Sequence, residues 1–186
     1  MDDRQIIALY WARAEQAIAE TAKRYGRYCH AIAYNILRSR EDSEECVNDT
    51  WLRAWDAMPP HRPERLDTFL GKITRNLALN HWEKASAAKR GGSRVSVALE
   101  ELRDCLPAAD SVETALDSMA LAGALNLFLA ALPAETRRIF VQRYWYMRPI
   151  KSIASELGAG ESKVKMTLLR TRAELKQYLE KEGINL

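Results

Sequence analysis

The sequence has few of the residues that interrupt helices, with eight glycines and six prolines among 186 residues. It also has almost no stretch in which apolar and polar residues alternate, the pattern of a strand with one buried face. Apolar residues make up 47% of the chain, enough to bury real cores, which excludes a disordered protein. The expected fold class is therefore all-α.

Cysteine is scarce as well, and its number and spacing argue against both disulfide bonds and a metal site. Cys29, Cys46 and Cys105 are odd in number and form no C-x-x-C pair, so a disulfide framework is not expected. The three histidines lie near no cysteine pair in a ligand spacing. We therefore expect no metal site and no cofactor.

Neither a targeting segment nor a membrane span is expected. The N-terminus, Met1-Asp2-Asp3, is acidic and lacks the apolar core of a signal peptide. The longest uncharged stretch, residues 119–132, is too short to cross a bilayer. No nucleophile–base pair and no glycine-rich phosphate loop is evident, so an enzyme is not favoured. We expect a cytoplasmic protein without membrane insertion.

Charge of both signs is present, but it is unevenly distributed. The formal net charge of the chain is +3. It divides into +2 over residues 1–92, −4 over residues 93–118 and +5 over residues 133–186. A basic C-terminal part is expected of a domain that meets phosphate, although a solvated helical surface would look the same. The acidic stretch indicates a linker between two parts.

Residues 149–182 carry the pattern of two helices joined by a tight turn. The first has an apolar stripe at i, i+3, i+4 and i+7, made of Ile150, Ile153, Ala154 and Leu157. A Gly158-Ala159-Gly160 turn follows. The second helix turns Val164, Leu168, Thr171 and Leu175 inward. This is a helix-turn-helix, which in DNA-binding proteins lays its second helix in the major groove. A helical hairpin in any bundle would show the same spacing, so the two interpretations stay open at this point.

Five further helices are expected from apolar periodicity. They cover residues 4–38, residues 44–58 capped by Ser43, residues 67–84, a helix resuming at residue 112, and residues 134–145. Gly26 marks either a break or a weak point in the first of them. Periodicity is lost over residues 85–109. The expected organisation is a domain over residues 1–90, a flexible acidic linker over residues 91–111 and a second domain over residues 112–186.

The helix over residues 67–84 interleaves basic and amide side chains with an aromatic one. Such a surface suits single-stranded nucleic acid, because bases stack on rings and phosphates meet cations. An ordinary amphipathic helix with a partly buried tryptophan has the same composition. Composition alone favours the second interpretation.

Three stretches in this order resemble the extracytoplasmic-function sigma factors, the smallest members of the bacterial sigma-70 family. They are DSEECVNDTWLRAW at residues 42–55, FLGKITRNLALN at residues 69–80, and LP at residues 132–133 followed by the helix-turn-helix ending LRTRAEL at residues 169–175. The resemblance covers about residues 17–179. It implies two helical domains on a tether, in a protein that directs RNA polymerase to promoters.

The resemblance also implies a division of roles. The first domain would bind core RNA polymerase and would read and open the minus-ten element, and the second would read the minus-thirty-five element as duplex. The acidic linker would lie in the RNA-exit path of polymerase. Core RNA polymerase and promoter DNA are the implied partners. An anti-sigma factor is a possible further partner, because both domains must expose surfaces that such a protein would cover.

Each role is assigned to residues of this chain by the resemblance. Duplex recognition falls to the exposed start of the last helix, at Glu161, Ser162, Lys163, Lys165, Met166, Thr167 and Arg170. Promoter melting falls to Arg75, Asn76, Asn80, Trp82 and Lys84, where the amides would read a base held out of the stack and the tryptophan would stack on it. Polymerase binding falls to Glu44, Asn48, Asp49 and Arg53, while Trp51 and Trp55 are expected to pack inward.

The sequence departs from the family pattern at several of these positions. Glu83 interrupts the basic cluster, Asn80 stands where the family often has Asp, and Met166-Thr167 stands where Ser-Arg is common. An alternative is a stand-alone helix-turn-helix regulator. That interpretation leaves residues 42–55 and 69–80 without a role.

Overall fold

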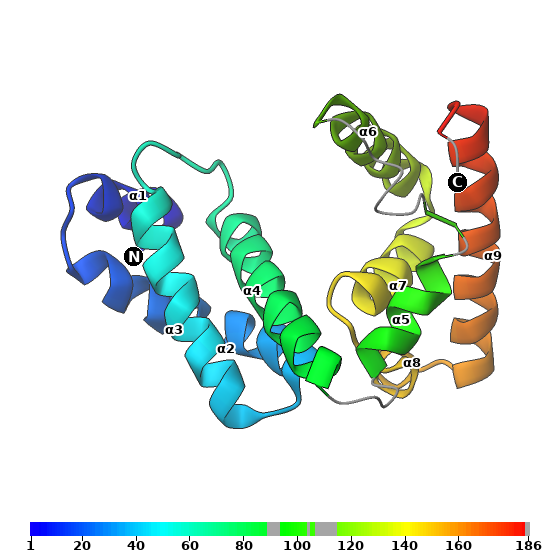
Figure 1. Cartoon of the computed structure of the whole chain (residues 1–186), viewed down its shortest axis with the longest axis horizontal. Helices are drawn as coiled ribbons and strands as arrows, with labels where there is room; N and C mark the ends of the chain where they lie inside the picture. The colour runs from blue at the N-terminus through cyan, green and yellow to red at the C-terminus, as the bar shows by residue number, and fades with distance from the viewer. Residues whose placement is uncertain (89–93, 104, 107–114, 185–186) are drawn as a thin grey trace. The chain divides into compact units, whose positions relative to one another are not determined.

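The computed structural model describes residues 1–88, 94–103, 105–106 and 115–184. Within these residues every element of regular secondary structure is a helix, which confirms the all-α fold class (Figure 1). The chain divides into two compact units, Met1–Gly91 and Gly92–Leu186. No helix in the described ranges combines the length and the apolar character that crossing a membrane requires.

The first unit consists of α1 (Asp3–Trp11), α2 (Gln16–Leu37), α3 (Arg40–Ala57) and α4 (Leu66–Ala88). Helices α2, α3 and α4 each contact the other two, and α1 packs on α2 (Figure 1). Their inward faces form one apolar core that includes Ile6, Tyr10, Trp51, Met58, Leu66 and Leu70. Trp55 packs against this core. The expectation that Trp51 and Trp55 pack inward is therefore confirmed.

The N-terminal segment is two helices, and the prediction of a single helix over residues 4–38 is wrong. Helix α1 ends after Trp11, and Arg13 adopts a positive φ of 53°, which a helix interior does not contain. Gly26, the candidate break, lies inside the continuous α2. The predicted cap of the next helix also shifts, because Ser39 rather than Ser43 accepts the first-turn backbone N–H.

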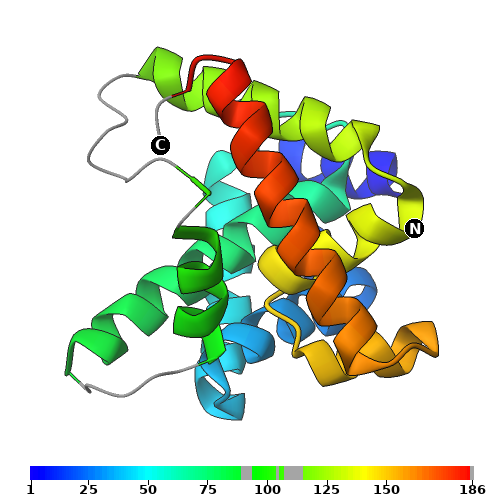
Figure 2. The same cartoon turned by 90° about the vertical axis from the view of Figure 1, so that its right-hand side faces the viewer.

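The second unit consists of α5 (Arg94–Arg103), α6 (Ala115–Ala131), α7 (Ala134–Tyr144), α8 (Ile150–Leu157) and α9 (Glu161–Lys181). Figure 2 shows α9 as the long helix with α8 at its N-terminal end and α6 beside its C-terminal half. Phe128 of α6 and Tyr178 of α9 lie 5.6 Å apart, measured between ring centroids. The buried side chains of this unit include Ile139, Ile153, Val164, Leu168 and Leu175.

The predicted helix-turn-helix is present as α8, a short turn and α9. Gly158 ends α8 in the left-handed region at φ 61°, a conformation that glycine adopts without steric cost. The N–H of Ala159 then donates to the carbonyl of Ala154 at 2.9 Å, which satisfies one of the last carbonyls of α8. The four positions expected to face inward on α9 are all buried.

The expected linker over residues 91–111 is not irregular throughout, because part of it is helical. Residues Arg94–Arg103 form α5, and Val95 and Ala98 of this helix are buried in the second unit. Helix α4 also continues to Ala88, past the predicted end at residue 84. The predicted start of the second domain at residue 112 lies outside the described residues.

Candidate nucleic-acid interface

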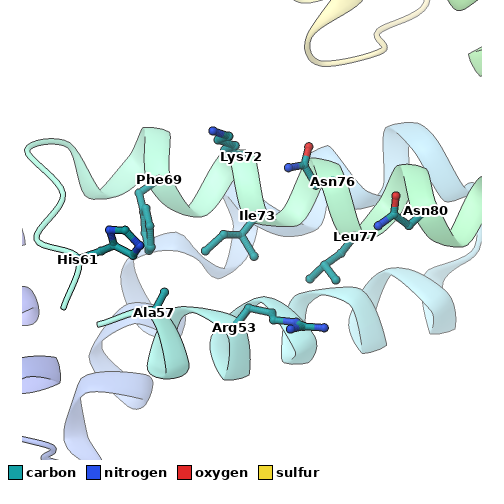
Figure 3. A pocket seen from close by; sticks show the side chains of 9 residues that line it. All are labelled: Arg53, Ala57, His61, Phe69, Lys72, Ile73, Asn76, Leu77 and Asn80. Atoms are coloured by element: carbon teal, nitrogen blue, oxygen red, sulfur yellow. The ribbon is translucent and has the colours of Figure 1, made fainter. Parts of the chain in front are cut away.

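A groove runs between α3 and α4 on the first unit (Figure 3). It has a volume of about 610 Å³. Figure 3 shows Ile73 and Leu77 pointing from α4 toward α3, whereas Lys72 and Asn76 stand along the rim. The groove is lined by Arg53, Ala57, His61, Phe69, Lys72, Ile73, Asn76, Leu77 and Asn80. An apolar floor with amide and cationic groups at its edge suits a flat, partly polar ligand.

A second hollow of about 400 Å³ shares three of these residues and extends toward the end of α4. It is lined by Glu45, Cys46, Asp49, Arg53, Leu77, Asn80, His81 and Lys84. Carboxylates from α3 therefore stand beside cations from both helices. Together the two hollows form one face of the first unit, which we call the α3–α4 groove.

The register of α4 explains why the groove stays open. Leu70, Thr74 and Ala78 face the interior of the unit and are fully buried. The groove residues occupy the adjacent face at positions 69, 72, 73, 76, 77, 80, 81 and 84, which form a stripe with helical spacing. Thr50 of α3 donates to Thr74 Oγ1 at 3.1 Å, so a buried hydrogen bond ties the two walls of the groove together.

Close approach of α2 supports α4 from behind. A Cβ built on Gly71 would lie 2.5 Å from the hydroxyl oxygen of Tyr28 on α2. A larger residue at position 71 would therefore require the end of the Tyr28 side chain to shift.

The structure brings together three of the five residues assigned to promoter melting. Asn76 and Asn80 line the α3–α4 groove, and Lys84 lines its extension. Arg75 and Trp82 line neither hollow and are half-buried on another face of α4. Burial lowers the pKa of the Arg75 guanidinium below its ordinary value.

The residues assigned to polymerase binding are all exposed on α3. Asp49 and Arg53 line the groove. Glu44 does not line it and forms an ion pair with Arg40, with 2.8 Å between Glu44 Oε1 and Arg40 Nε. The set assigned to docking thus overlaps the set assigned to melting. Leu52, with 59% of its surface exposed beside this set, is an apolar contact that the sequence did not single out.

Sequence reasoning also missed His61 and Phe69 as groove residues. His61 comes from the loop before α4, where no periodicity could place it. Phe69 is partly buried and packs against the core of the first unit, but it also lines the groove. One signal in the sequence could have revealed the groove face. Positions 69, 72, 73 and 76 share one face of the helix, and that face is distinct from the buried face that contains Leu70.

On the second unit the candidate duplex contacts follow the exposed start of α9. Glu161, Ser162, Lys163, Lys165, Met166 and Arg170 are exposed, and Thr167 is half-buried. The Thr167 hydroxyl donates to the Lys163 carbonyl at 2.9 Å, which turns it back onto the helix. Lys163 Nζ lies 2.8 Å from Glu135 Oε1, and this lysine lowers the pKa of the Glu135 carboxyl. Lys165 has no such ion pair among the described residues.

An ionic network fixes α8, the helix that positions α9. Glu156 of α8 accepts hydrogen bonds from Arg138 of α7 and from Arg148. Gln142 Nε2 donates to the same carboxylate at 3.2 Å. Arg148 and then Arg138 lower the pKa of Glu156 from 4.5 to about 2. This network orients the helix-turn-helix and does not itself lie on α9.

Cys29 and Cys46 offer no reactive thiol, although Cys46 lines part of the α3–α4 groove. All three are buried, and burial raises the pKa of Cys29 to about 11 and that of Cys46 to about 12. Such thiols are protonated and unreactive at neutral pH. Among the described residues no three His, Cys, Asp or Glu side chains cluster as metal ligands would.

Two family models match the chain, one in each unit. Sigma-70 region 2 matches residues 21–88, and Sigma-70, region 4 matches residues 122–175. The chain belongs to the sigma-70 family of RNA polymerase sigma factors. Sigma factors of this family bind core RNA polymerase and promoter DNA.

Curated relatives place it in the extracytoplasmic-function group. The chain is 26% identical over 181 residues to the ECF RNA polymerase sigma factor SigE of Mycolicibacterium smegmatis, covering 95% of this chain and 68% of that protein. It is 27% identical over 190 residues to the ECF RNA polymerase sigma factor SigM of Mycobacterium tuberculosis, covering 99% and 89%. It is also 30% identical over 150 residues to the probable RNA polymerase sigma factor RfaY of Xanthomonas campestris, covering 80% of this chain. The match spans 37% of that relative.

These matches decide between the two interpretations of the helix-turn-helix. A stand-alone helix-turn-helix regulator is not favoured, because it would leave the region 2 match over residues 21–88 unexplained. As a sigma factor the chain is a transcription initiation factor.

Proposed function

We propose that this sigma factor divides its work between its two units. The first, residues 1–90, binds core polymerase and reads and opens the minus-ten element. The second, residues 112–186, reads the minus-thirty-five element as duplex. The protein acts in the cytoplasm and performs no catalysis of its own, since the chemistry of transcription belongs to polymerase.

The observation that carries this proposal is the α3–α4 groove, which has an apolar floor and two asparagines at its edge. An unstacked base presents a flat apolar face and a polar edge, and those two features match the floor and the rim. Asn76 and Asn80 have side-chain amides that both donate and accept hydrogen bonds, as reading a base edge requires. Lys72 and Lys84 are exposed cations close enough along α4 to meet the flanking phosphates.

The groove also indicates how polymerase and promoter share the first unit. Asp49 and Arg53 face the groove, whereas Glu44, Asn48 and Leu52 extend the exposed surface of α3 beyond its lining. We assign polymerase contact chiefly to Glu44, Asn48 and Leu52. An apolar residue within a charged surface is the usual composition of a protein contact. An anti-sigma protein would compete for the same surface.

Duplex reading is assigned to α9. Its N-terminal turn is exposed, and the cations Lys163, Lys165 and Arg170 follow it along the helix. Short polar side chains at the start of such a helix reach base edges, while the cations meet phosphates. Because this module is small, we expect weak promoter binding by the free chain and stronger binding with polymerase.

The test is promoter opening by the full-length chain with core polymerase. A promoter library identifies a start site, and a fluorescent base analogue in the minus-ten element then reports unstacking. Asn80→Ala should slow opening about tenfold, because it removes hydrogen bonds to the captured base. Closed-complex affinity should remain unchanged, since duplex recognition belongs to α9.

Asn48→Ala is the matched control, an exposed asparagine on α3 that lines neither hollow. It should lower polymerase affinity without a specific effect on unstacking. Equal effects of the two substitutions on unstacking would contradict the base-holding role of the groove. Absence of promoter-specific transcripts from the unaltered chain would contradict the proposed function as a whole.

A further inference from the structure

Helix α9 carries apolar side chains on two opposite faces. The inward face, which includes Val164 and Leu168, is buried where α9 packs against α7 and α8. The opposite face lies about half a turn away and carries side chains at intervals of three and four residues. We call these side chains the outer stripe, and all of them are exposed: Ser162, Met166, Leu169 and Ala173. Met166 has 46% of its surface exposed and Leu169 has 52%.

The outer stripe is apolar only near the start of α9. The same series of positions continues with Gln177 and Glu180, which are polar or charged and exposed. A single exposed apolar side chain needs no explanation. Met166 and Leu169, however, are neighbours on the helix surface, and they lie in the turns that a helix-turn-helix lays in the major groove. The apolar part of the stripe therefore coincides with the part of α9 that is assigned to duplex reading.

Cations stand on both sides of the outer stripe. Arg170 lies on one side of it and Lys165 on the other, and both are exposed. Neither forms an ion pair among the residues that the structure describes. Phosphates border the major groove on both sides, whereas the floor of the groove presents the edges of the bases. An apolar stripe between two cations is complementary to that arrangement, which favours duplex DNA as its occupant.

The chemistry of Met166 selects one feature of the groove floor. Its side chain has no hydrogen-bond donor and only a weak acceptor, so it would leave the polar edge of a base unsatisfied. Thymine presents a methyl group in the major groove, and the flexible thioether of methionine adapts to small apolar groups. The adjacent Thr167 offers no competing donor, because its hydroxyl donates to the Lys163 carbonyl at 2.9 Å.

We propose that Met166 is a specificity-determining residue that contacts the 5-methyl group of a thymine in the minus-thirty-five duplex. Leu169, one turn further along α9, extends the same apolar contact. This rests on the proposed function, because duplex reading by α9 is what brings the outer stripe to the bases. It adds to that function the identity of one base in the element.

The test uses core polymerase with the full-length chain and a minus-thirty-five duplex from a promoter that this complex selects. Deoxyuridine, substituted for one thymine at a time, removes only the methyl group. At one position the affinity of the unaltered chain should fall about fourfold, the loss expected when one methyl-sized group is no longer buried. Equal affinity for thymine and deoxyuridine at every position, or a selected element without thymine, would overturn the proposal.

Substitutions at position 166 assign the contact to Met166. Met166→Gln should weaken binding of the thymine duplex by about the same factor and should no longer distinguish thymine from deoxyuridine at that position. Met166→Leu keeps an apolar side chain and should retain the preference for thymine. A preference of unchanged size in Met166→Gln would overturn the assignment.

Met119→Gln is the matched control. Met119 is a methionine of α6 with 71% of its surface exposed, and it does not lie on α9. The ratio of the affinities for the thymine and deoxyuridine duplexes should remain that of the unaltered chain. Loss of the preference in this variant as well would show that the effect is not specific to the outer stripe, and would overturn the proposal.

Two further outcomes separate this proposal from the proposed function and from a protein contact. If polymerase with the unaltered chain binds the element no better than a scrambled duplex, duplex reading by α9 fails and the proposal fails with it. If binding is specific but insensitive to the methyl group, only the role of Met166 fails. Self-association of the free chain that Met166→Gln abolishes, measured by sedimentation, would assign the outer stripe to a second copy and overturn the proposal.

Discussion

The two units place different polar groups in their interiors. In the first, Tyr10 shares a hydrogen bond of 3.0 Å with Thr21, and Thr50 donates to Thr74 at 3.1 Å. These are neutral hydroxyl groups. In the second, the buried Arg143 pairs with the half-buried Glu101, and a second ionic network on the exposed Glu156 joins α7 to α8.

The difference follows from the lengths of the helices. Helices α2, α3 and α4 are long enough to pack along one shared core, so neutral hydrogen bonds need only fix their register. Helices α5 and α8 have ten and eight residues and bury little apolar surface. Charged side chains from α7 compensate by holding both in place.

The largest expected effect tests whether the two cores are independent. Leu70→Ala removes a fully buried side chain from the first unit and should lower its free energy of unfolding by about 3 kcal/mol. Amide exchange should rise across α2, α3 and α4 while α7, α8 and α9 keep their protection.

Leu168→Ala is the matched substitution in the second unit, where Leu168 is 1% exposed. It should raise amide exchange across α7, α8 and α9 while α2, α3 and α4 keep their protection. If either substitution raises exchange in both units, the cores are coupled and the comparison fails.

A smaller effect distinguishes the ionic network on Glu156 in the second unit from the neutral hydrogen bonds of the first unit by its dependence on pH. Arg148 and Arg138 hold the pKa of Glu156 at about 2, below its ordinary value of 4.5. A depressed carboxyl pKa stabilises the folded state above pH 4.5, and that contribution is lost as the pH falls through about 2. Glu156→Gln should therefore destabilise the second unit by about 1 kcal/mol at neutral pH.

The difference between Glu156→Gln and the unaltered chain should shrink as the pH falls from 4.5 toward 2. Denaturant unfolding followed by exchange in each unit measures it. Thr74→Val, which removes a neutral hydrogen bond from the first unit, is the control and should cost the same at each pH. A constant effect of Glu156→Gln would show that its ion pairs do not carry the stability assigned to them.

The sequence predicted the parts of this fold that depend on local signals. The helix-turn-helix could be placed because Gly158 and Gly160 separate two apolar stripes. Helix α8 ends just before these glycines and α9 begins just after them. The break before α2 could not, because residues 12–15 contain neither glycine nor proline. Helix α5 has apolar residues at 95, 98 and 102, a helical spacing, but Val97 and Leu99 are apolar as well and blur that pattern.

The α3–α4 groove was only partly predictable for a physical reason. Asn76, Asn80 and Lys84 could be selected by their chemistry. Whether Phe69 lines a groove as well as packing on the core depends on contacts between α3 and α4, such as that of Thr50 with Thr74. Those contacts join residues far apart in the sequence, and no local pattern encodes them.

The smallest expected effect concerns the exposed cations of α9. Lys163 is paired with Glu135, whereas Lys165 is exposed and has no ion pair among the described residues. A lysine that meets a phosphate releases a counterion, so Lys165→Ala should reduce the salt dependence of promoter binding by about one unit of slope. The measurement is the affinity of polymerase with this sigma factor for a minus-thirty-five duplex over a range of salt concentrations.

The control is Lys176→Ala, because Lys176 is an exposed lysine further along α9. This substitution should leave the slope unchanged, since only the start of α9 enters the major groove of the DNA. Equal slopes for the two variants would show that the duplex contact does not lie at the start of α9, and would leave the α3–α4 groove as the better supported of the two DNA-binding surfaces.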